Sequence, residues 1–432
     1  MPPLHGEERM GPTLFEGCDT FGALAGETRG PAAPVLDLFP GLERPDEYSE
    51  NPALPLPQGT TMDLALLKET REGESRVALA PDHVDLFTKL GFRVRVESGA
   101  GAAAGWPDEE YIGAGAEVAP DAGGALAGAR VVVKVLPPHP DEVVRMPEGA
   151  LLISFLSPAD PDPLPELINR GVDALALERV PRTTRAQRMD ALSSQATAVG
   201  YVGALLAASH LTRFLPMLTT AAGTIPPARV LVLGAGVAGL QAIATARRLG
   251  ARVRAYDIRA AAAEQVQSLG ATFVQAALPE EAEVEGGYAR ALSGSEEERQ
   301  HALLMEEVPA ADAVITTAQI PGRPAPRLIT AEMVELMSPG SVIVDLAADT
   351  GGNCELSRPG ETVRHGPATI VAPLQPASRL PQDASRMLGR NIAALLKEMV
   401  KEGDLVVSEE DDIVDAALVV RGGRNRKAPK GG

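Results

Sequence analysis

Short apolar runs alternate with amphipathic stretches from Met62 onward. The runs have the length of buried strands, whereas residues 81–90 repeat their apolar positions with a helical period. Strands separated by helical segments predict a parallel sheet with helices on both faces. We therefore expect a first α/β domain with strands at residues 64–67, 93–96, 130–135 and 151–155.

A second α/β unit begins at residue 229. Its pattern predicts a helix at residues 236–249 and strands at residues 229–233, 252–257, 313–317 and 341–346. The long uncharged stretch before it, residues 193–214, predicts a helix of about 30 Å, which is long enough to bridge two domains. The apolar helix expected at residues 384–400 should pack on the first domain, because the second sheet already has its strands.

These elements define the expected domains. The first occupies residues 62–192 and is completed by residues 377–421, whereas the second, with its linking helix, occupies residues 193–376. Residues 1–61 are acidic, rich in Pro and Gly, and lack periodicity, which favours a disordered extension; an over-called start codon is the alternative. Residues 422–432 are expected to form a flexible tail, and the Gly286-Gly-Tyr288 break to be an exposed loop.

Composition narrows the functional classes. A net charge of −18 repels phosphate backbones and anionic lipids, so nucleic acid is not an expected partner. Two cysteines, Cys18 and Cys354, are too few for a disulfide framework or a Cys-rich zinc site, and we expect no metal. The amino terminus lacks the pattern of a signal peptide. Residues 191–212 carry no formal charge but hold too many polar groups for a lipid-facing span, which predicts a soluble chain.

A glycine-rich motif, Leu233-Gly234-Ala-Gly236-Val-Ala-Gly239, follows an expected strand and opens an expected helix. In this context the first glycine makes a tight turn, the second lets the backbone approach a pyrophosphate, and the third lets helix and strand pack closely. The diphosphate would meet free amide groups at the positive end of the helix dipole. The motif therefore predicts a dinucleotide site that includes Val237 and Ala238.

Residues at the end of the next expected strand predict which dinucleotide binds. Asp257 stands where a carboxylate accepts hydrogen bonds from the adenosine ribose hydroxyls and repels the 2′-phosphate of NADP. Arg259 pulls the other way, because an arginine here can accommodate that phosphate. The directly placed carboxylate weighs more, so we predict NAD(H), with Ile258 in the site and Arg259 at the diphosphate edge or in a surface ion pair.

Three further segments are distinctive: Arg182-Thr-Thr-Arg185-Ala-Gln187-Arg-Met-Asp190-Ala-Leu-Ser193-Ser194-Gln195, residues 220–239, and Gly351-Gly-Asn-Cys-Glu355. They resemble the NAD(H)-binding alpha subunits of proton-translocating NAD(P) transhydrogenases, and the resemblance extends from Met62 to about Arg421. It implies an α/β fold of two Rossmann-like parallel-sheet domains joined by long helices, with a cleft between them. Alanine dehydrogenases belong to the same superfamily.

The resemblance also implies roles for individual residues. In that family the first of these segments holds the nicotinamide: Arg182 and Ser193 would contact the carboxamide, Asp190 would orient Arg182, and Gln187 would reach the nucleotide of a partner. A surface Arg–Asp pair that caps the following helix is the alternative. The segment 286–289 resembles a mobile loop that closes over NAD(H), which places Tyr288 over the nucleotide. Gln300 falls on a family NAD contact, and Gln319 stands in the pocket where the family usually has Leu.

The implied reaction is NADH + NADP⁺ ⇌ NAD⁺ + NADPH, coupled to proton movement. Hydride transfer between two nicotinamides needs positioning and exclusion of water rather than a general acid or base. The chain has one dinucleotide fingerprint, so NADP(H) and the proton channel are expected on partner subunits. The resemblance implies a homodimer without a membrane span of its own, cytoplasmic and peripheral to the membrane through those subunits.

Two alternatives remain open. An alanine-type amino-acid dehydrogenase is favoured by Arg76 and Lys134, which match residues that hold the keto acid in those enzymes. Ser157 disfavours it, because it stands where they have an acid/base histidine. Arg76 and Lys134 are then expected to be relics or members of structural ion pairs. The second alternative is an NAD(H)-binding dimer without activity.

Overall fold

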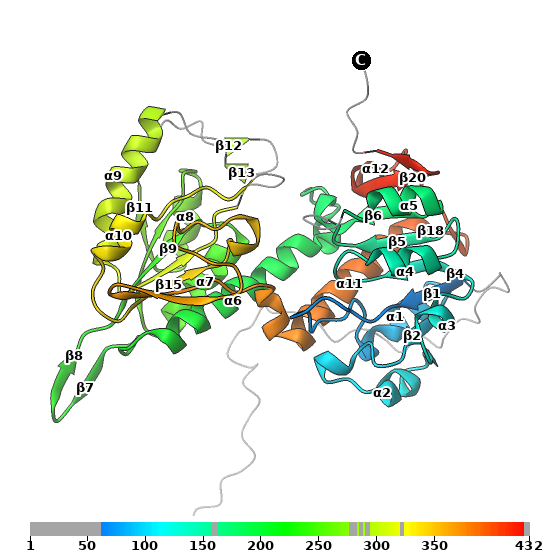
Figure 1. Cartoon of the computed structure of the whole chain (residues 1–432), viewed down its shortest axis with the longest axis horizontal. Coiled ribbons are helices and arrows are strands. Elements are labelled where there is room, and N and C mark those ends of the chain that lie inside the picture. Colours follow the sequence, from blue (N-terminus) through cyan, green and yellow to red (C-terminus); the bar gives the residue numbers. More distant parts are fainter. Residues whose placement is uncertain are drawn as a thin grey trace, which may run out of the picture. The chain divides into compact units, whose positions relative to one another are not determined.

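The computed structural model describes residues 62–156, 162–275, 283–284, 288–289, 294–319 and 324–426. All of them lie in one compact unit of the chain. Their strands form two large sheets and three short hairpins (Figure 1).

The first sheet has the strand order β21-β20-β6-β5-β4-β1-β2-β3. Its first six strands in the sequence are parallel, and β20 adds an antiparallel edge to β6. The strands are β1 (Met62–Leu66), β2 (Phe92–Glu97), β3 (Glu117–Ala119), β4 (Ala129–Val133), β5 (Leu151–Ser154), β6 (Asp173–Ala176), β20 (Leu418–Arg421) and β21 (Arg424–Asn425). The connecting helices are η2 (Pro81–His83), α1 (Val84–Thr88), η3 (Ala102–Ala104), α2 (Asp108–Gly113), α3 (Ala122–Leu126), α4 (Pro140–Arg145), α5 (Leu164–Arg170), η4 (Leu177–Arg179) and η5 (Gln187–Met189).

The second sheet has the order β11-β10-β9-β14-β15-β17-β16, in which β16 alone is antiparallel to its neighbour. Its strands are β9 (Arg229–Leu233), β10 (Arg252–Tyr256), β11 (Thr272–Val274), β14 (Ala313–Thr316), β15 (Ser341–Asp345), β16 (Thr362–His365) and β17 (Ala368–Val371). The helices are α7 (Val237–Arg248), α8 (Ala262–Ser268), α9 (Gly294–Ala310), α10 (Ala331–Glu335), η6 (Ala348–Thr350) and η7 (Pro376–Arg379). In both sheets the first strand is central and the order reverses beside it, as in Rossmann folds. The predicted fold class is confirmed.

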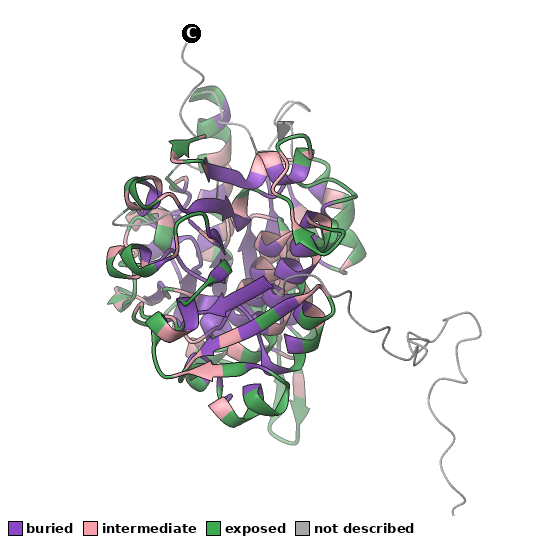
Figure 2. Cartoon of the chain, turned by 90° about the vertical axis from the view of Figure 1, so that its right-hand side faces the viewer, coloured by how far each residue is buried: buried purple, intermediate pink, exposed green. Residues whose placement is uncertain are grey.

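The apolar runs became central strands because both faces of each sheet are covered. Along β1, Leu64 and Leu66 belong to one core cluster, whereas Ala65 belongs to the cluster on the other face. Along β9, alternate residues again divide between two clusters, Val230 on one side and Leu231 on the other. Successive strand side chains point to opposite faces, so a strand covered on both sides is apolar throughout. Figure 2, in which the first domain faces the viewer, shows strands of its sheet largely in the colour of buried residues.

Two long helices connect the two sheets, α6 (Ala191–His210) and α11 (Pro381–Met399). Ala191, at the start of α6, lies in a core cluster of the first sheet, and Val202 and Leu206 lie in a cluster of the second. Helix α11 packs on α6 and contributes Leu388 and Ile392 to the first-sheet cluster.

Helix α6 is long and apolar enough to cross a membrane and is the one such helix among the described residues. Half of its most apolar stretch is buried within the protein, and the core helix of a soluble protein passes the same test.

The observed boundaries differ from the expected ones in several places. The linking helix spans residues 191–210 instead of 193–214, and the segment predicted as one helix at 81–90 is a 3₁₀ turn followed by α1. The hairpin of β7 (Leu218–Thr220) and β8 (Gly223–Ile225) was not anticipated. Strand β21 pairs with β20, so the tail expected from residue 422 begins with sheet structure. The remaining elements are β12 (Glu283–Val284), β13 (Tyr288–Ala289), β18 (Val400–Lys401), β19 (Asp404–Leu405) and α12 (Asp412–Ala417).

Candidate functional site

The glycine motif forms the turn between β9 and α7, and glycine is needed at each of its three positions for a different reason. Gly234 has φ of +97°, a left-handed conformation that other residues rarely adopt. A Cβ at Gly239 would lie 1.8 Å from the carbonyl oxygen of Gly234, whereas a Cβ at Gly236 would meet no atom within 4 Å. The second glycine therefore leaves an open approach to the backbone, as a pyrophosphate requires.

The amino end of α7 is suited to bind an anion. Gly236 is the N-cap of the helix and offers no side-chain acceptor to the first amides, which belong to Val237, Ala238 and Gly239. Such amides need a partner, and the helix dipole makes that partner preferably negative. The residues present thus fit the diphosphate of a dinucleotide.

Two polar side chains that follow later strands fix the backbone at and beside this turn. Thr317 Oγ1, just after β14, donates to the carbonyl oxygen of Gly234 at 3.0 Å. Asn353 is fully buried, and its Nδ2 donates to the carbonyl oxygens of Ala318 and Pro326, each at 2.8 Å. Sequence reasoning gave neither residue a role, although Asn353 lies in one of the motifs that carry the resemblance. The neighbouring Gln319 is exposed and directly follows this fixed backbone.

Asp257 lies where the sequence predicts it, beside the glycine turn, and its carboxylate already has four donors. Oδ2 accepts from the amide of Ala235 at 2.7 Å and from Arg259 Nη2 at 2.8 Å. Oδ1 accepts from the amide and from Nε of Arg259, each at 2.9 Å. The alternative expected for Arg259, an ion pair, is therefore present, and the partner is Asp257 itself. Ile258, between them, packs against the core.

The structure describes Tyr288, which is expected to cover the nucleotide, and Gln300, which is expected to contact it, to different extents. Gln300 on α9 donates from Nε2 to the hydroxyl of Tyr256 at 3.0 Å, and burial raises the pKa of that tyrosine to about 12. The backbone of Tyr288 pairs with Val284 in the β12–β13 hairpin. The side chain of Tyr288 lies outside the described part of the structure, so its position over the nucleotide stays a prediction.

The expected nicotinamide residues gather at the start of α6. Asp190 is the N-cap: its Oδ1 accepts from the amide of Ser193 at 2.9 Å and its Oδ2 from the Ser193 hydroxyl at 2.6 Å. Arg182 Nε lies 4.0 Å from Asp190 Oδ2, and about a third of the Arg182 side chain is exposed. Gln187 lies on η5 and is exposed. The structure thus brings three of the four together and leaves Gln187 facing solvent.

Helix α6 joins this loop to the glycine turn. A Cβ at Gly200 would lie 2.0 Å from the carbonyl oxygen of Ala238, so the two helices touch at the first turn of α7. Ten helical residues separate Gly200 from Asp190, which corresponds to about 15 Å. Only glycine at position 200 lets α6 approach the first turn of α7 this closely, so α6 links the loop directly to the turn.

Arg76 and Lys134 are buried and fully engaged by acidic neighbours. Arg76 donates from Nε and Nη2 to the two carboxylate oxygens of Glu74, at 2.8 and 2.6 Å. It also donates to Gln195 and Gln375. Lys134 Nζ lies 2.7 Å from Glu142 and 3.9 Å from Glu69, whose pKa burial raises to about 7. Both cations therefore belong to internal ion pairs, as one of the two expectations had it. Ser157 lies outside the described residues.

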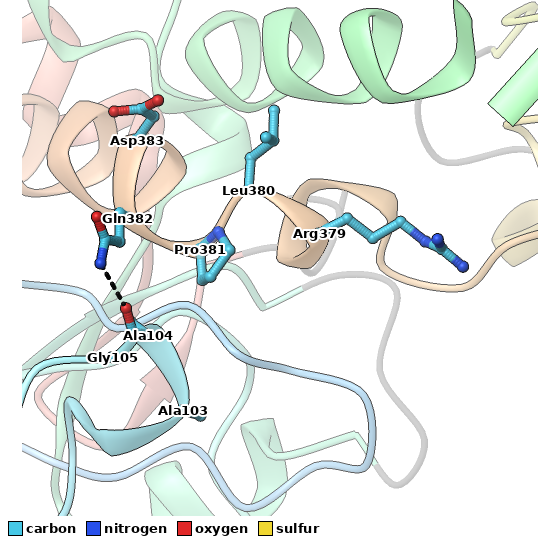
Figure 3. Close-up of a pocket in the computed structure, with 8 residues that line it drawn as sticks. All are labelled: Ala103, Ala104, Gly105, Arg379, Leu380, Pro381, Gln382 and Asp383. Atoms are coloured by element: carbon cyan, nitrogen blue, oxygen red, sulfur yellow. Dashed lines mark hydrogen bonds between the residues drawn. The ribbon is translucent and has the colours of Figure 1, made fainter. Parts of the chain in front are cut away.

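The described residues contain no set of three or more His, Cys, Asp or Glu that could hold a metal ion. A shallow, open groove borders η3 and the start of α11 (Figure 3), where Gln382 Nε2 donates to the carbonyl oxygen of Ala104 at 3.2 Å. The groove shares no residue with the glycine turn or the loop, so it is not assigned to the site.

Comparison with known proteins agrees with this geometry. Residues 65–199 and 203–428 match the models of the N-terminal and C-terminal domains of the alanine dehydrogenase/PNT family. The chain is 46% identical to an NAD(P) transhydrogenase alpha-subunit chain of Rhodospirillum rubrum, over 84% of this chain and 97% of that protein. It is 31% identical to the alanine dehydrogenase of Bacillus subtilis, over 68% of this chain and 72% of that protein.

A solved structure shows the same similarity. The crystal structure of a transhydrogenase from Sinorhizobium meliloti superposes with a TM-score of 0.76 at 43% identity, and covers 84% of this chain and 99% of the other. These matches confirm the resemblance inferred from the motifs. The chain belongs to the alanine dehydrogenase/PNT family, and within it to the NAD(P) transhydrogenase alpha subunits.

Proposed function

We propose that this chain is the NAD(H)-binding subunit of a proton-translocating transhydrogenase and passes hydride between NADH and NADP⁺ held on a partner subunit. The observation that carries the proposal is the arrangement along α6. The helix contacts the glycine turn of α7 at Gly200, and the polar loop with Asp190 lies at its start. A nicotinamide supplies the chemistry when it is bound, since a hydride with its two electrons leaves C4 of NADH and joins C4 of NADP⁺.

The chain's own residues bind and orient. The amides of α7 would hold the diphosphate, and Arg182 with Ser193 would fix the carboxamide of the nicotinamide. Asp190 supports both, because it binds the Ser193 hydroxyl and lies beside Arg182. Gln187, exposed next to them, would face the partner's nucleotide. Hydride transfer needs the two reacting carbons about 3–3.5 Å apart, so orientation is the main catalytic task.

The function is tested by mixing the purified chain with the NADP-binding component of a transhydrogenase and following the reduction of an NAD⁺ analogue by NADPH. We expect a rate far above that of either component alone. The absence of any such excess would refute the proposal. NADH oxidation that requires pyruvate and ammonia would instead establish the amino-acid dehydrogenase, and NADH binding without turnover in both assays the inactive dimer.

We predict that the chain binds NADH at least about tenfold tighter than NADPH. The Asp257 carboxylate is 8% exposed and would repel a 2′-phosphate, and its hold on Arg259 occupies the cation beside it. Fluorescence titration measures both affinities. Replacement of Asp257 by Asn should reduce the preference for NADH over NADPH, whereas replacement of Arg259 by Gln should preserve it. Equal affinities for the two nucleotides in the unmodified chain would contradict this assignment.

We further propose a homodimer that docks on the cytoplasmic face of membrane-embedded partner subunits. The β7–β8 hairpin supports the dimer: its strands pair only with each other, and Figure 1 shows the hairpin extending away from the second sheet. Phe214, Met217 and Ile225 around it are exposed by 55%, 63% and 37%. An isolated hairpin is marginally stable in water, so we expect a second copy to cover this one.

The dimer is tested by sedimentation equilibrium at micromolar concentration. We expect the unmodified chain to be a dimer and the Met217→Lys variant to be largely monomeric. Ile112→Lys is the matched control, because Ile112 is 57% exposed on α2 of the first domain and should leave the dimer intact. A monomeric unmodified chain would disprove the proposal.

A further inference from the structure

We propose that Arg185 is a positioning residue, which holds the loop that carries Arg182 and Gln187 against the C-terminal helices α11 and α12. The inference rests on the proposed function of that loop. Arg185 lies within the motif but has no part in the roles assigned to its neighbours. Its side chain contacts a cluster of carboxylates from residues more than 200 positions later in the chain.

The contact with Asp411 has the geometry of a strong ion pair. Arg185 Nη1 donates to Asp411 Oδ2 at 2.8 Å, and Nη2 donates to Asp411 Oδ1 at 3.0 Å. The same guanidinium contacts Asp412 and lies 3.5 Å from Glu398 on α11. A bidentate pair fixes orientation as well as distance, because the planar fork matches the carboxylate.

We call the bidentate pair of Arg185 and Asp411 the clamp. Its acidic side is rigid. Asp411 is the N-cap of α12 and accepts from the amides of Ile413 and Val414 at 3.0 and 3.1 Å. Both of these residues are buried in the protein core. Arg185 lowers the pKa of Asp411 to about 2, so the carboxylate stays charged throughout the neutral range. The clamp therefore has one fixed end, and any freedom belongs to the loop.

The inner side of the loop is held by the core of the first domain and by α11. Ala186 and Met189 are buried in the first core, and the carbonyl oxygen of Arg188 accepts from Asn391 Nδ2 at 2.9 Å. The outer side of the loop, with Arg182 and Gln187, is exposed. Arg185 is three residues from the first and two from the second, so its clamp restrains the part of the loop that must aim at the nicotinamides.

The expected effect concerns rate more than stability. Exposed ion pairs add little to the free energy of unfolding, and 43% of the Arg185 side chain is exposed. A displacement of 1 Å in reacting geometry, by contrast, lowers a rate by about 100-fold. Loosening one of several restraints should lower hydride transfer by about tenfold, while NADH affinity stays within about twofold.

The test compares Arg185→Met and Arg185→Lys with Arg93→Met. Arg93 is the matched control, because its side chain is also 43% exposed and makes a bidentate pair with Asp63 far from the loop. Hydrogen exchange measured by mass spectrometry follows the loop directly through the amides of Ala186 and Met189, which are hydrogen bonded within it. We expect at least threefold faster loop exchange in Arg185→Met, an intermediate effect in Arg185→Lys and none in Arg93→Met.

The same variants are then assayed with the NADP-binding component. A tenfold lower kcat for Arg185→Met, with unchanged NADH affinity and thermal midpoint, supports the positioning role. Unchanged loop exchange, or losses of kcat, affinity and stability in parallel, would overturn it. Failure of the proposed function is recognised separately, because the unmodified chain would then show no transfer while the exchange result still decides whether Arg185 holds the loop.

Discussion

Replacement of Gly239 by Ala is expected to weaken NADH binding by about 100-fold and to destabilise the chain. The new methyl group would lie 1.8 Å from the carbonyl oxygen of Gly234 and 2.8 Å from its carbonyl carbon, so the turn or α7 must move. Such overpacking against backbone costs about 1–3 kcal/mol. The amides that face the diphosphate move with it, and two lost charge-assisted hydrogen bonds of about 1.5 kcal/mol each account for the affinity. Titration calorimetry and urea unfolding measure the two effects.

Two further glycines separate binding from folding. A methyl group at Gly236 meets no protein atom, so Gly236→Ala should fold normally and still bind NADH poorly, because it blocks the approach of the diphosphate. Gly113, at the end of α2, also has open space and lies in the other domain; Gly113→Ala should change neither property. Full NADH affinity in both Gly236→Ala and Gly239→Ala would place the nucleotide elsewhere.

Both sheets were predictable from the sequence because their strands are covered on both faces. A strand such as β9 must be apolar at every position, and that requirement leaves a continuous run which periodicity detects. The glycine turn was predictable for a related reason: a left-handed φ at Gly234 and a backbone contact at Gly239 admit no other residue. Local constraints of this kind are visible in a few consecutive residues.

The features that sequence reasoning missed depend on distant partners. The role of Asn353 becomes clear only when the backbone of Ala318 lies beside it. An ion pair was expected for Arg76, but its hydrogen bonds to Gln195 and Gln375 join residues more than 100 positions apart. The strands of the β7–β8 hairpin have three residues each and none of these residues is buried, so no apolar periodicity marks them. For Asp257 the position was predicted, but not that Arg259 already occupies its carboxylate.

Replacement of Arg182 by Ala is expected to lower hydride transfer about 100-fold, while NADH affinity changes by less than about threefold. In the proposed complex the amides of the α7 turn bind the diphosphate, about 15 Å along α6 from this loop, so we expect the NADH affinity to depend little on Arg182. The orientation of the nicotinamide should depend on Arg182, because Arg182 lies beside Asp190, which in turn binds the Ser193 hydroxyl. Without the guanidinium the ring is free to rotate, and a misplacement of about 1 Å corresponds to the expected loss of rate. Single-turnover kinetics with the NADP-binding component measure the rate.

Arg188→Ala is the control for that experiment, since Arg188 is an exposed arginine on the same loop and its contact to Asn391 uses only the backbone. It removes the same charge from the same surface, so any effect on docking of the partner through net charge appears in both variants. The difference between the two is then the orienting effect of Arg182 alone. Equal losses in both variants would show that the loop contributes charge to a docking surface, and a loss of NADH affinity in step with the rate in Arg182→Ala would show that the loop anchors the nucleotide instead of aiming it.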